Sequence, residues 1–167
     1  MAMVFYIAGA IAAIATVLMI ASLRPVHALL YLIVSLLAVA VVFYTLGAPF
    51  VAVLEIIIYA GAIMVLFVFV VMLLNLGSRT ARSEQALLAP SAWIGPSILA
   101  AILLVEFFYL MTQGAPPAPV TTIDAQEVSI ALYGPYLIAV ELASMLLLGG
   151  LVAAYHLGRR RGPEAEA

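Results

Sequence analysis

Residues 50–76 read FVAVLEIIIYAGAIMVLFVFVVMLLNL, and this stretch decides the fold. A helix needs about 20 mostly apolar residues to cross a bilayer. The run is longer than that, and Glu55 is its one carboxylate. Apolar and polar residues do not alternate along it, as they would in a strand of a membrane barrel. Residues 50–76 therefore predict a membrane-spanning α-helix that is long enough to tilt or to contain a local irregularity.

The rest of the chain has a similar composition. Of its 167 residues, 68% are apolar and 8% are charged, whereas soluble proteins average about 45–50% and about 25%. So few charges cannot cover a globule of this size, which excludes soluble enzymes, disordered tails and nucleic-acid-binding proteins. There is no cysteine, which excludes disulfides and cysteine-ligated iron–sulfur clusters. We therefore expect an integral membrane protein.

Four further apolar runs flank residues 50–76, separated by prolines, glycines and charged residues. The predicted fold is all-α, with five transmembrane helices in a single membrane domain, residues 1–167. An exposed loop is expected at residues 113–127, a short interfacial helix at 128–132, and a tail at 158–167. The five expected spans are residues 2–22, 26–46, 50–76, 91–112 and 133–157.

The basic residues predict the orientation in the membrane. Each of them follows an odd-numbered span, so all of them lie on one side of the bilayer. The positive-inside rule makes that side cytoplasmic. The N-terminus and the loop at residues 113–127 are then external, and the C-terminal tail is cytoplasmic. The basic residues are Arg24, Arg79, Arg82, Arg159, Arg160 and Arg161.

Three carboxyl groups fall well inside the spans, those of Glu55, Glu106 and Glu141. A charged side chain there costs at least about 2.5 kcal/mol, so a functional role, such as relaying protons, is the default hypothesis. The alternative is a neutral or hydrogen-bonded glutamate that joins helices. Both hypotheses stay open for Glu55 and Glu141. Glu106 is near the external end of its span, and we expect its carboxyl to reach the interface.

The surroundings of Glu55 suggest more than one arrangement. Glu55 and Tyr59 stand four residues apart and share a helix face, so the tyrosine hydroxyl can bond the carboxyl or order a water. The small residues 60–62, Ala-Gly-Ala, predict close packing between helices. The alternative is a kink or a π-bulge, because a mid-helix glycine such as Gly61 makes a backbone irregularity less costly.

No sequence pattern points to a catalytic centre. There is no phosphate-binding loop, metal-ligand cluster or nucleophile–base pair. His27 and His156 lie at the same predicted side of the membrane and could in principle hold a haem. Histidines at helix ends more commonly cap helices or lie at the headgroups, and we expect that here. The spans also have too few polar groups for a self-sufficient transporter. We expect the chain to supply one wall of a route shared with partner chains.

Four stretches resemble the subunit J family of bacterial NADH–quinone oxidoreductase, respiratory complex I. The likeness covers nearly all of the chain in order, and the motif of the third span is the most specific. The stretches are RPVHALLY (24–31), LEIIIYAGAIMVLFVFVVM (54–72), WIGP (93–96) and the run that begins with GPY (134–148).

The resemblance implies a non-catalytic subunit of a membrane complex that oxidises NADH, reduces quinone and pumps protons. It implies a place in the bacterial cytoplasmic membrane beside subunits A, H, K and N, surrounded by lipid. The FMN, the iron–sulfur clusters and the quinone would be bound in other subunits, with no cofactor or metal in this chain. Two alternatives stay open: a membrane subunit of a related cation/proton antiporter or membrane-bound hydrogenase, and a passive assembly scaffold.

The resemblance also implies a gating role for the third helix. In the family this helix carries a π-bulge that can relax to a regular α-helix, which is the proposed gate of a water chain leading to glutamates of subunit K. Carried over to this chain, the bulge covers residues 59–67. Glu106 is not part of the family pattern, and no role follows for it. The candidate path and gate residues are Glu55, Tyr59, Gly61, Val65 and Phe67, with Glu141 as a secondary candidate for the path or for helix packing.

Overall fold

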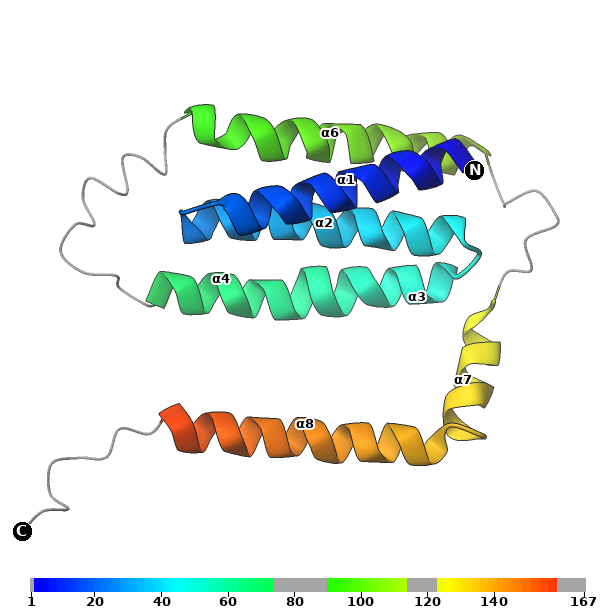
Figure 1. Cartoon of the computed structure of the whole chain (residues 1–167). Coiled ribbons are helices and arrows are strands. Elements are labelled where there is room, and N and C mark those ends of the chain that lie inside the picture. Colours follow the sequence, from blue (N-terminus) through cyan, green and yellow to red (C-terminus); the bar gives the residue numbers. More distant parts are fainter. Residues whose placement is uncertain (1, 74–89, 114–122, 159–167) are drawn as a thin grey trace, which may run out of the picture. The chain divides into compact units, whose positions relative to one another are not determined.

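The computed structural model describes residues 2–73, 90–113 and 123–158, and all regular elements in these ranges are helices (Figure 1). The all-α prediction is therefore confirmed. α3, η1 and α4 run on continuously as one helix, called the third helix below, in which η1 is π-helical. The elements are α1 (Ala2–Ala21), α2 (Pro25–Thr45), α3 (Pro49–Leu54), η1 (Glu55–Ile63), α4 (Met64–Leu73), α6 (Pro90–Gln113), α7 (Ala125–Tyr133) and α8 (Leu137–Gly158).

The chain divides into two compact units, Met1–Asp124 and Ala125–Ala167. The first unit contains α1, α2, the third helix and α6, and the second contains α7 and α8. The expectation of one membrane domain over residues 1–167 stays a prediction.

Within the described ranges, five helices are long and apolar enough to cross a membrane, as the sequence predicted. They differ from the expected spans mainly at the last one, which begins at Leu137 instead of residue 133. Tyr133 instead ends the preceding helix. The five candidate spans are Ala2–Ala21, Pro25–Thr45, Pro49–Val71, Trp93–Thr112 and Leu137–Gly158.

The predicted connections differ in detail from the structure. The short helix expected at residues 128–132 is α7, which is longer at its N-terminal end. Both ends of the predicted loop at 113–127 are helical, because Gln113 belongs to α6 and residues 125–127 belong to α7. Residues 74–76 of the third predicted span, residues 114–122 of that loop, and the tail after Gly158 lie outside the described residues.

Two turns of the first unit follow from local chemistry. Arg24 is extended (φ −109°, ψ 117°) and Pro25 opens α2, at a position where no backbone N–H is needed. Gly47 has φ 83°, a conformation that glycine adopts without steric cost, and it allows the tight turn into α3. The carbonyl of Gly47 accepts a hydrogen bond of 2.9 Å from the N–H of Ile123. This bond attaches the residues that precede α7 to the α2–α3 turn.

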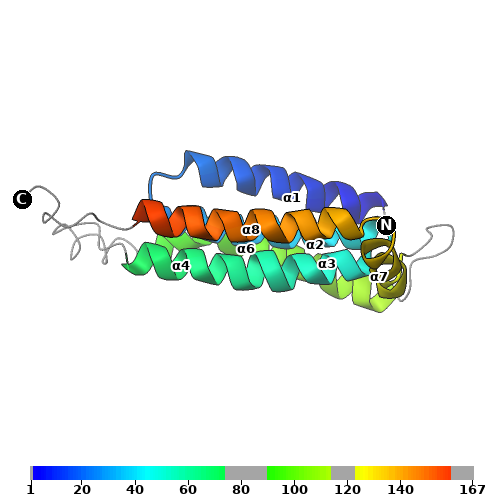
Figure 2. The same ribbon diagram turned by 90° about the horizontal axis from the view of Figure 1, so that it is seen from below.

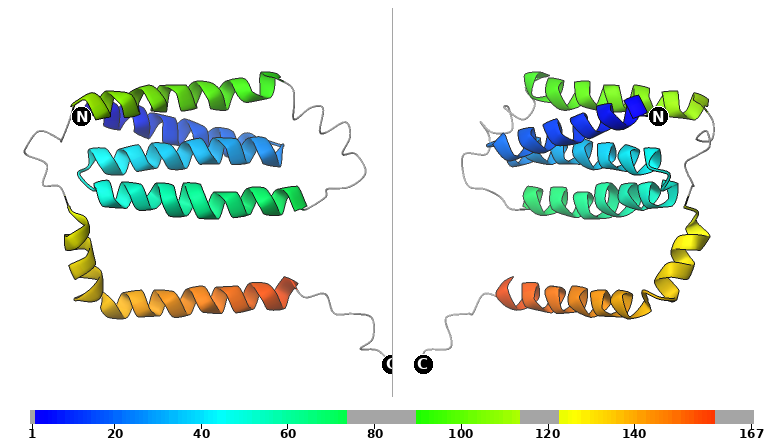
Figure 3. Two further views of the ribbon diagram at one scale, coloured as in Figure 1. Left: turned by 180° about the vertical axis from the view of Figure 1, so that it is seen from behind. Right: turned by 45° about the vertical axis from the view of Figure 1, so that its right-hand side comes forward.

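α2 is the central helix of the first unit, because α1, the third helix and α6 all pack against it (Figures 2 and 3). Large apolar side chains are exposed on those three neighbours, whereas α2 exposes none. Small residues allow the close approach of α1, since Ala15 and Ala38 are fully buried. The hydroxyls of Thr16 and Ser35 also share a hydrogen bond of 2.8 Å across the α1–α2 contact.

In the second unit, α7 meets α8 at a steep angle (Figure 3). The bend needs glycine at position 134, because a Cβ there would lie only 2.7 Å from the carbonyl oxygen of Ile130. Pro135 follows and cannot donate a helical hydrogen bond. No residue of α8 is buried within this unit.

We predict that Gly95→Ala weakens the α2–α6 contact by about 1 kcal/mol, the low end of the cost of overpacking. A Cβ at Gly95 would collide with the hydroxyl of Tyr31, so the ring must turn away from α6. The measurement is the thermal stability of the detergent-purified protein. Tyr31→Phe removes the colliding oxygen and should restore most of the loss in the double variant. Equal losses in G95A and in Y31F/G95A would contradict the predicted contact.

Candidate functional site

The π-helical segment η1 lies in the middle of the third helix. At its beginning the N–H of Glu55 bonds the carbonyls of Ala52 and Val51, three and four residues back. At its end the N–H of Met64 bonds the carbonyls of Gly61 and Tyr59, three and five residues back. A bond over five residues is the π pattern, so one turn of this helix has an extra residue. Such wide turns inside α-helices occur frequently at functional sites.

Gly61 matches the wide turn. A Cβ at this position would lie 3.1 Å from the carbonyl oxygen of Ile56, five residues earlier, which is closer than an ordinary contact. No atom of a neighbouring helix would come within 4 Å of that Cβ. Within this chain, Gly61 therefore makes no close contact with another helix. The alternative, a backbone irregularity, is what the structure contains.

The boundaries of the irregularity differ from the predicted ones. The resemblance placed it at residues 59–67, whereas η1 covers Glu55–Ile63. The wide turn precedes Gly61 because the opposing carbonyl belongs to Ile56. Val65 and Phe67 consequently lie in the α-helical segment α4, and both side chains are about half exposed or more.

Glu55 and Tyr59 both lie in η1, but no hydrogen bond joins them in the described part of the chain. The predicted bond assumed that a spacing of four residues places both side chains on one face. A π turn holds about 4.4 residues, so residues four apart still lie on nearly the same face of the helix. The spacing therefore allows the bond, but the two side chains do not form it. The side chain of Glu55 is partly buried, and that of Tyr59 is 51% exposed.

Met64 was missed as a structural residue. It follows η1 directly and is 1% exposed, the largest fully buried side chain among the described residues. All positions around it are apolar, so no periodic change in polarity marked the side that faces α2.

The expectation for Glu106 is wrong. Its side chain is 7% exposed, and both carboxyl oxygens are shielded within the first unit without a hydrogen-bond partner. Leu103 and Leu110, one turn before and one turn after Glu106 on the same face of α6, are also buried. This face of α6 points into the bundle, so the carboxyl does not extend to the interface.

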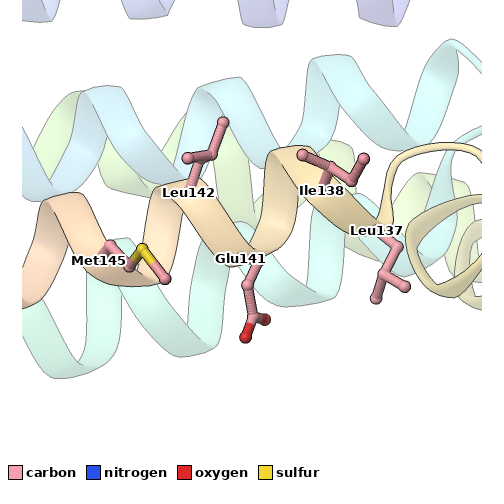
Figure 4. A pocket seen from close by; sticks show the side chains of 5 residues that line it. All are labelled: Leu137, Ile138, Glu141, Leu142 and Met145. Carbon is pink, nitrogen blue, oxygen red and sulfur yellow. The ribbon is translucent and has the colours of Figure 1, made fainter.

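Glu141 belongs to the second unit, where its side chain is exposed. Leu137, Glu141 and Met145 follow one another at four-residue spacing along α8 and share a side of it. Together with Ile138 and Leu142 they line an open pocket, and Figure 4 shows the carboxyl of Glu141 directed away from the helix.

The described residues contain no group of three or more histidine, aspartate or glutamate side chains placed to hold a metal ion. His27 lies in the first turn of α2, and its Nε2 is buried without a partner. His156 is exposed in the last turn of α8.

The fold and the distribution of side chains define a class of protein. Large apolar side chains are exposed along α1, the third helix, α6 and α8. Such large apolar surfaces are unfavourable in contact with water, whereas lipid or apolar partner helices can cover them. The protein is a multi-pass α-helical membrane protein.

Comparison with known proteins gives the family. The family model described as NADH-ubiquinone/plastoquinone oxidoreductase chain 6 matches residues 15–157. NADH-quinone oxidoreductase subunit J of Pseudomonas aeruginosa is 58% identical over 158 residues, which are 93% of this chain and 95% of the relative. The subunit J of Escherichia coli is 58% identical over 159 residues, 93% of this chain and 85% of the relative. The subunit J of Buchnera aphidicola subsp. Schizaphis graminum is 47% identical over 166 residues, which are 96% of this chain and 99% of the relative.

The chain belongs to the subunit J, or chain 6, family of NADH-quinone oxidoreductase, and it is a membrane subunit of that complex, complex I. The resemblance seen in the sequence is thereby confirmed.

Proposed function

We propose that this subunit helps to couple quinone reduction to proton translocation by lining and gating a water-filled proton path with the third helix. The subunit itself catalyses no step. The observation that carries the proposal is the π-helical segment η1, in the middle of a membrane-spanning helix and with a carboxyl group, that of Glu55, at its first residue. A wide turn with an extra residue can relax to a regular α-helical turn or shift along the helix. The backbone groups then change hydrogen-bond partners within the helix.

The geometry of a helix shows what such a change would move. Each residue of an α-helix turns the chain by about 100°, so relaxing η1 to α-helix rotates α4 by about 100° relative to α3. Val65 and Phe67 lie in α4 and would rotate with it. Met64 would at the same time leave its buried position. The gate is therefore a rotation that exchanges which side chains of α4 face α2 and which face the path.

The carboxyl of Glu55 and the hydroxyl of Tyr59 are the candidate proton-carrying groups on this path. A partly buried carboxyl inside a span is a functional candidate because burying its charge is costly. Glu141, exposed within its own unit, is a secondary candidate for the path or for packing against a neighbouring subunit.

The remaining roles belong to the whole complex. Subunits A, H, K and N are the proposed neighbours, and FMN, iron–sulfur clusters and quinone are bound outside this chain. The proposed location is the bacterial cytoplasmic membrane, with a periplasmic N-terminus and a cytoplasmic C-terminus. Family membership leaves the antiporter and hydrogenase alternatives without support. The competing hypothesis is a passive scaffold, in which activity depends only on the amount of assembled complex.

Gly61→Val tests the gate. The added Cβ opposes the carbonyl of Ile56 only in the π register, so we expect the α register to be favoured. A bias of about 1.4 kcal/mol lowers the ratio of the π register to the α register about tenfold, and coupled turnover should fall by up to that factor. NADH-driven proton pumping is measured in membrane vesicles and normalised to assembled complex.

Gly9→Val is the matched control for Gly61→Val, because a Cβ at Gly9 meets no atom within 4 Å. This variant should pump normally. Normal pumping by G61V would exclude the gating role. A loss of activity in G61V that merely follows a loss of assembled complex would favour the passive scaffold.

Glu55→Gln separates a proton relay from a helix-joining role. The amide keeps the size and polarity of the side chain but cannot exchange a proton, so a relay predicts a fall of about tenfold or more in coupled turnover. The exposed carboxyl of Glu127, outside the spans, supplies the control variant Glu127→Gln, which should leave turnover unchanged. Unchanged pumping in E55Q would show that Glu55 only joins helices.

The orientation can be tested with single cysteines, because the chain has none of its own. Leu23 and Leu46 are 99% and 58% exposed at opposite ends of α2. The positive-inside rule predicts that L23C reacts with a membrane-impermeant maleimide in inverted vesicles and L46C in intact spheroplasts. Labelling after detergent solubilisation controls for shielding by other subunits. The opposite pattern would reverse the proposed orientation.

A further inference from the structure

Glu106 is buried in the first unit. It belongs to α6 and not to the third helix, and the proposed function does not use it. It is one of two polar residues that are buried among the described residues, the other being Ser35. Ser35 shares a hydrogen bond with Thr16, whereas neither carboxyl oxygen of Glu106 has a partner. A buried polar group without a partner needs an explanation.

The position of Glu106 follows from the packing of α6. Leu103 lies in a buried cluster with Ile11 and Ala15 of α1 and with Val34 and Ala38 of α2. Glu106 is three residues, or about 4.5 Å, further along the same face of α6. Its carboxyl therefore lies where three apolar helices meet.

The helices packed around Glu106 offer no positive charge. α1 has no basic residue, and its titratable side chain, Tyr6, is exposed. α6 has no basic residue either, and its Tyr109 is about half exposed. The titratable side chains of α2 are His27, Tyr31 and Tyr44, and none of them donates a hydrogen bond to Glu106.

The one basic group on these helices is also distant. Tyr31 is at the level of Gly95, and α2 and α6 run in the same direction (Figure 1). Glu106 is eleven residues beyond Gly95, and His27 is four residues before Tyr31. Along the helix axes these two side chains are therefore about 22 Å apart.

Hydrogen-bond donors are missing as well, which decides the protonation state. An ionised carboxylate only accepts hydrogen bonds, and the backbone N–H groups of regular helices already bond within each helix. A neutral carboxyl has an O–H donor, and helix carbonyls retain a free lone pair that can accept it. Only the neutral form can find a partner among the groups around Glu106.

We propose that Glu106 is a proton-binding site within the bundle of α1, α2 and α6, held as a neutral carboxylic acid that donates to a main-chain carbonyl. The ligand of this site is a single proton. The site is separate from η1, and it stands whether or not the third helix acts as a gate.

Infrared spectra of the assembled complex at neutral pH test the proposal. The difference between wild type and E106Q should show the loss of one carbonyl band of a protonated carboxylic acid, and no loss of a carboxylate band. E127Q is the matched control, because Glu127 is an exposed carboxyl outside the spans and its removal should remove carboxylate bands instead. Loss of a carboxylate band in E106Q would overturn the proposal.

The yield of assembled complex gives a second, independent readout. E106Q and E106L replace a neutral group by neutral groups of similar size, so the yields of both should stay comparable to that of wild type. An ionised Glu106 paired with a cation of a neighbouring subunit would instead need its charge, and both variants would then lose assembly. A loss of assembled complex in both E106Q and E106L would contradict the proposal that Glu106 is a neutral carboxylic acid.

Discussion

The requirement that every backbone N–H and C=O be paired inside the bilayer governs this structure. Lipid supplies no hydrogen bonds, so each span must satisfy its own backbone, and the helix does so within a single segment. The π-helical segment η1 keeps to this rule, because its hydrogen bonds run over five residues instead of four. An extra residue is thus accommodated in mid-membrane without exposing polar groups to lipid. The feature proposed as a gate is the kind of irregularity that the bilayer permits.

Packing between the helices follows a second constraint. Apolar side chains gain little by moving from lipid to protein, so helices associate through close contact and hydrogen bonds. α2 shows both, in its fully buried Ala38 and in the Ser35–Thr16 hydrogen bond. Since the third helix packs on α2 and Met64 of α4 is buried, a rotation of α4 would have to disturb this packing.

The candidate site was predictable in part. Residues 50–76 read as an apolar span interrupted by Gly61, and a mid-span irregularity was among the two alternatives considered. Its limits were wrong by four residues at each end, because the position of a wide turn depends on which carbonyl opposes the glycine. The Glu55–Tyr59 bond was one of two arrangements considered, and the structure does not contain it. A shared helix face permits such a bond, but the directions of the two side chains decide whether it forms.

Glu106 shows a different limit of prediction. In a soluble helix, polar residues mark the outer face and apolar residues the buried one. In α6 nearly every residue is apolar, so the face that packs on the bundle and the face that meets lipid look alike. The carboxyl was assigned to the interface from its distance to the helix end, whereas the direction of its face decided its burial.

The sequence by itself determined the number of long apolar helices, their approximate ends and the family. These depend on composition, on the length needed to cross a bilayer and on local backbone chemistry, all of which can be read along the chain. Only the tertiary structure decided that α2 is central, that Met64 and Glu106 are buried, and that η1 covers Glu55–Ile63. Those properties depend on which face of each helix meets another helix. In lipid both the packed face and the exposed face are apolar, so the sequence does not distinguish them.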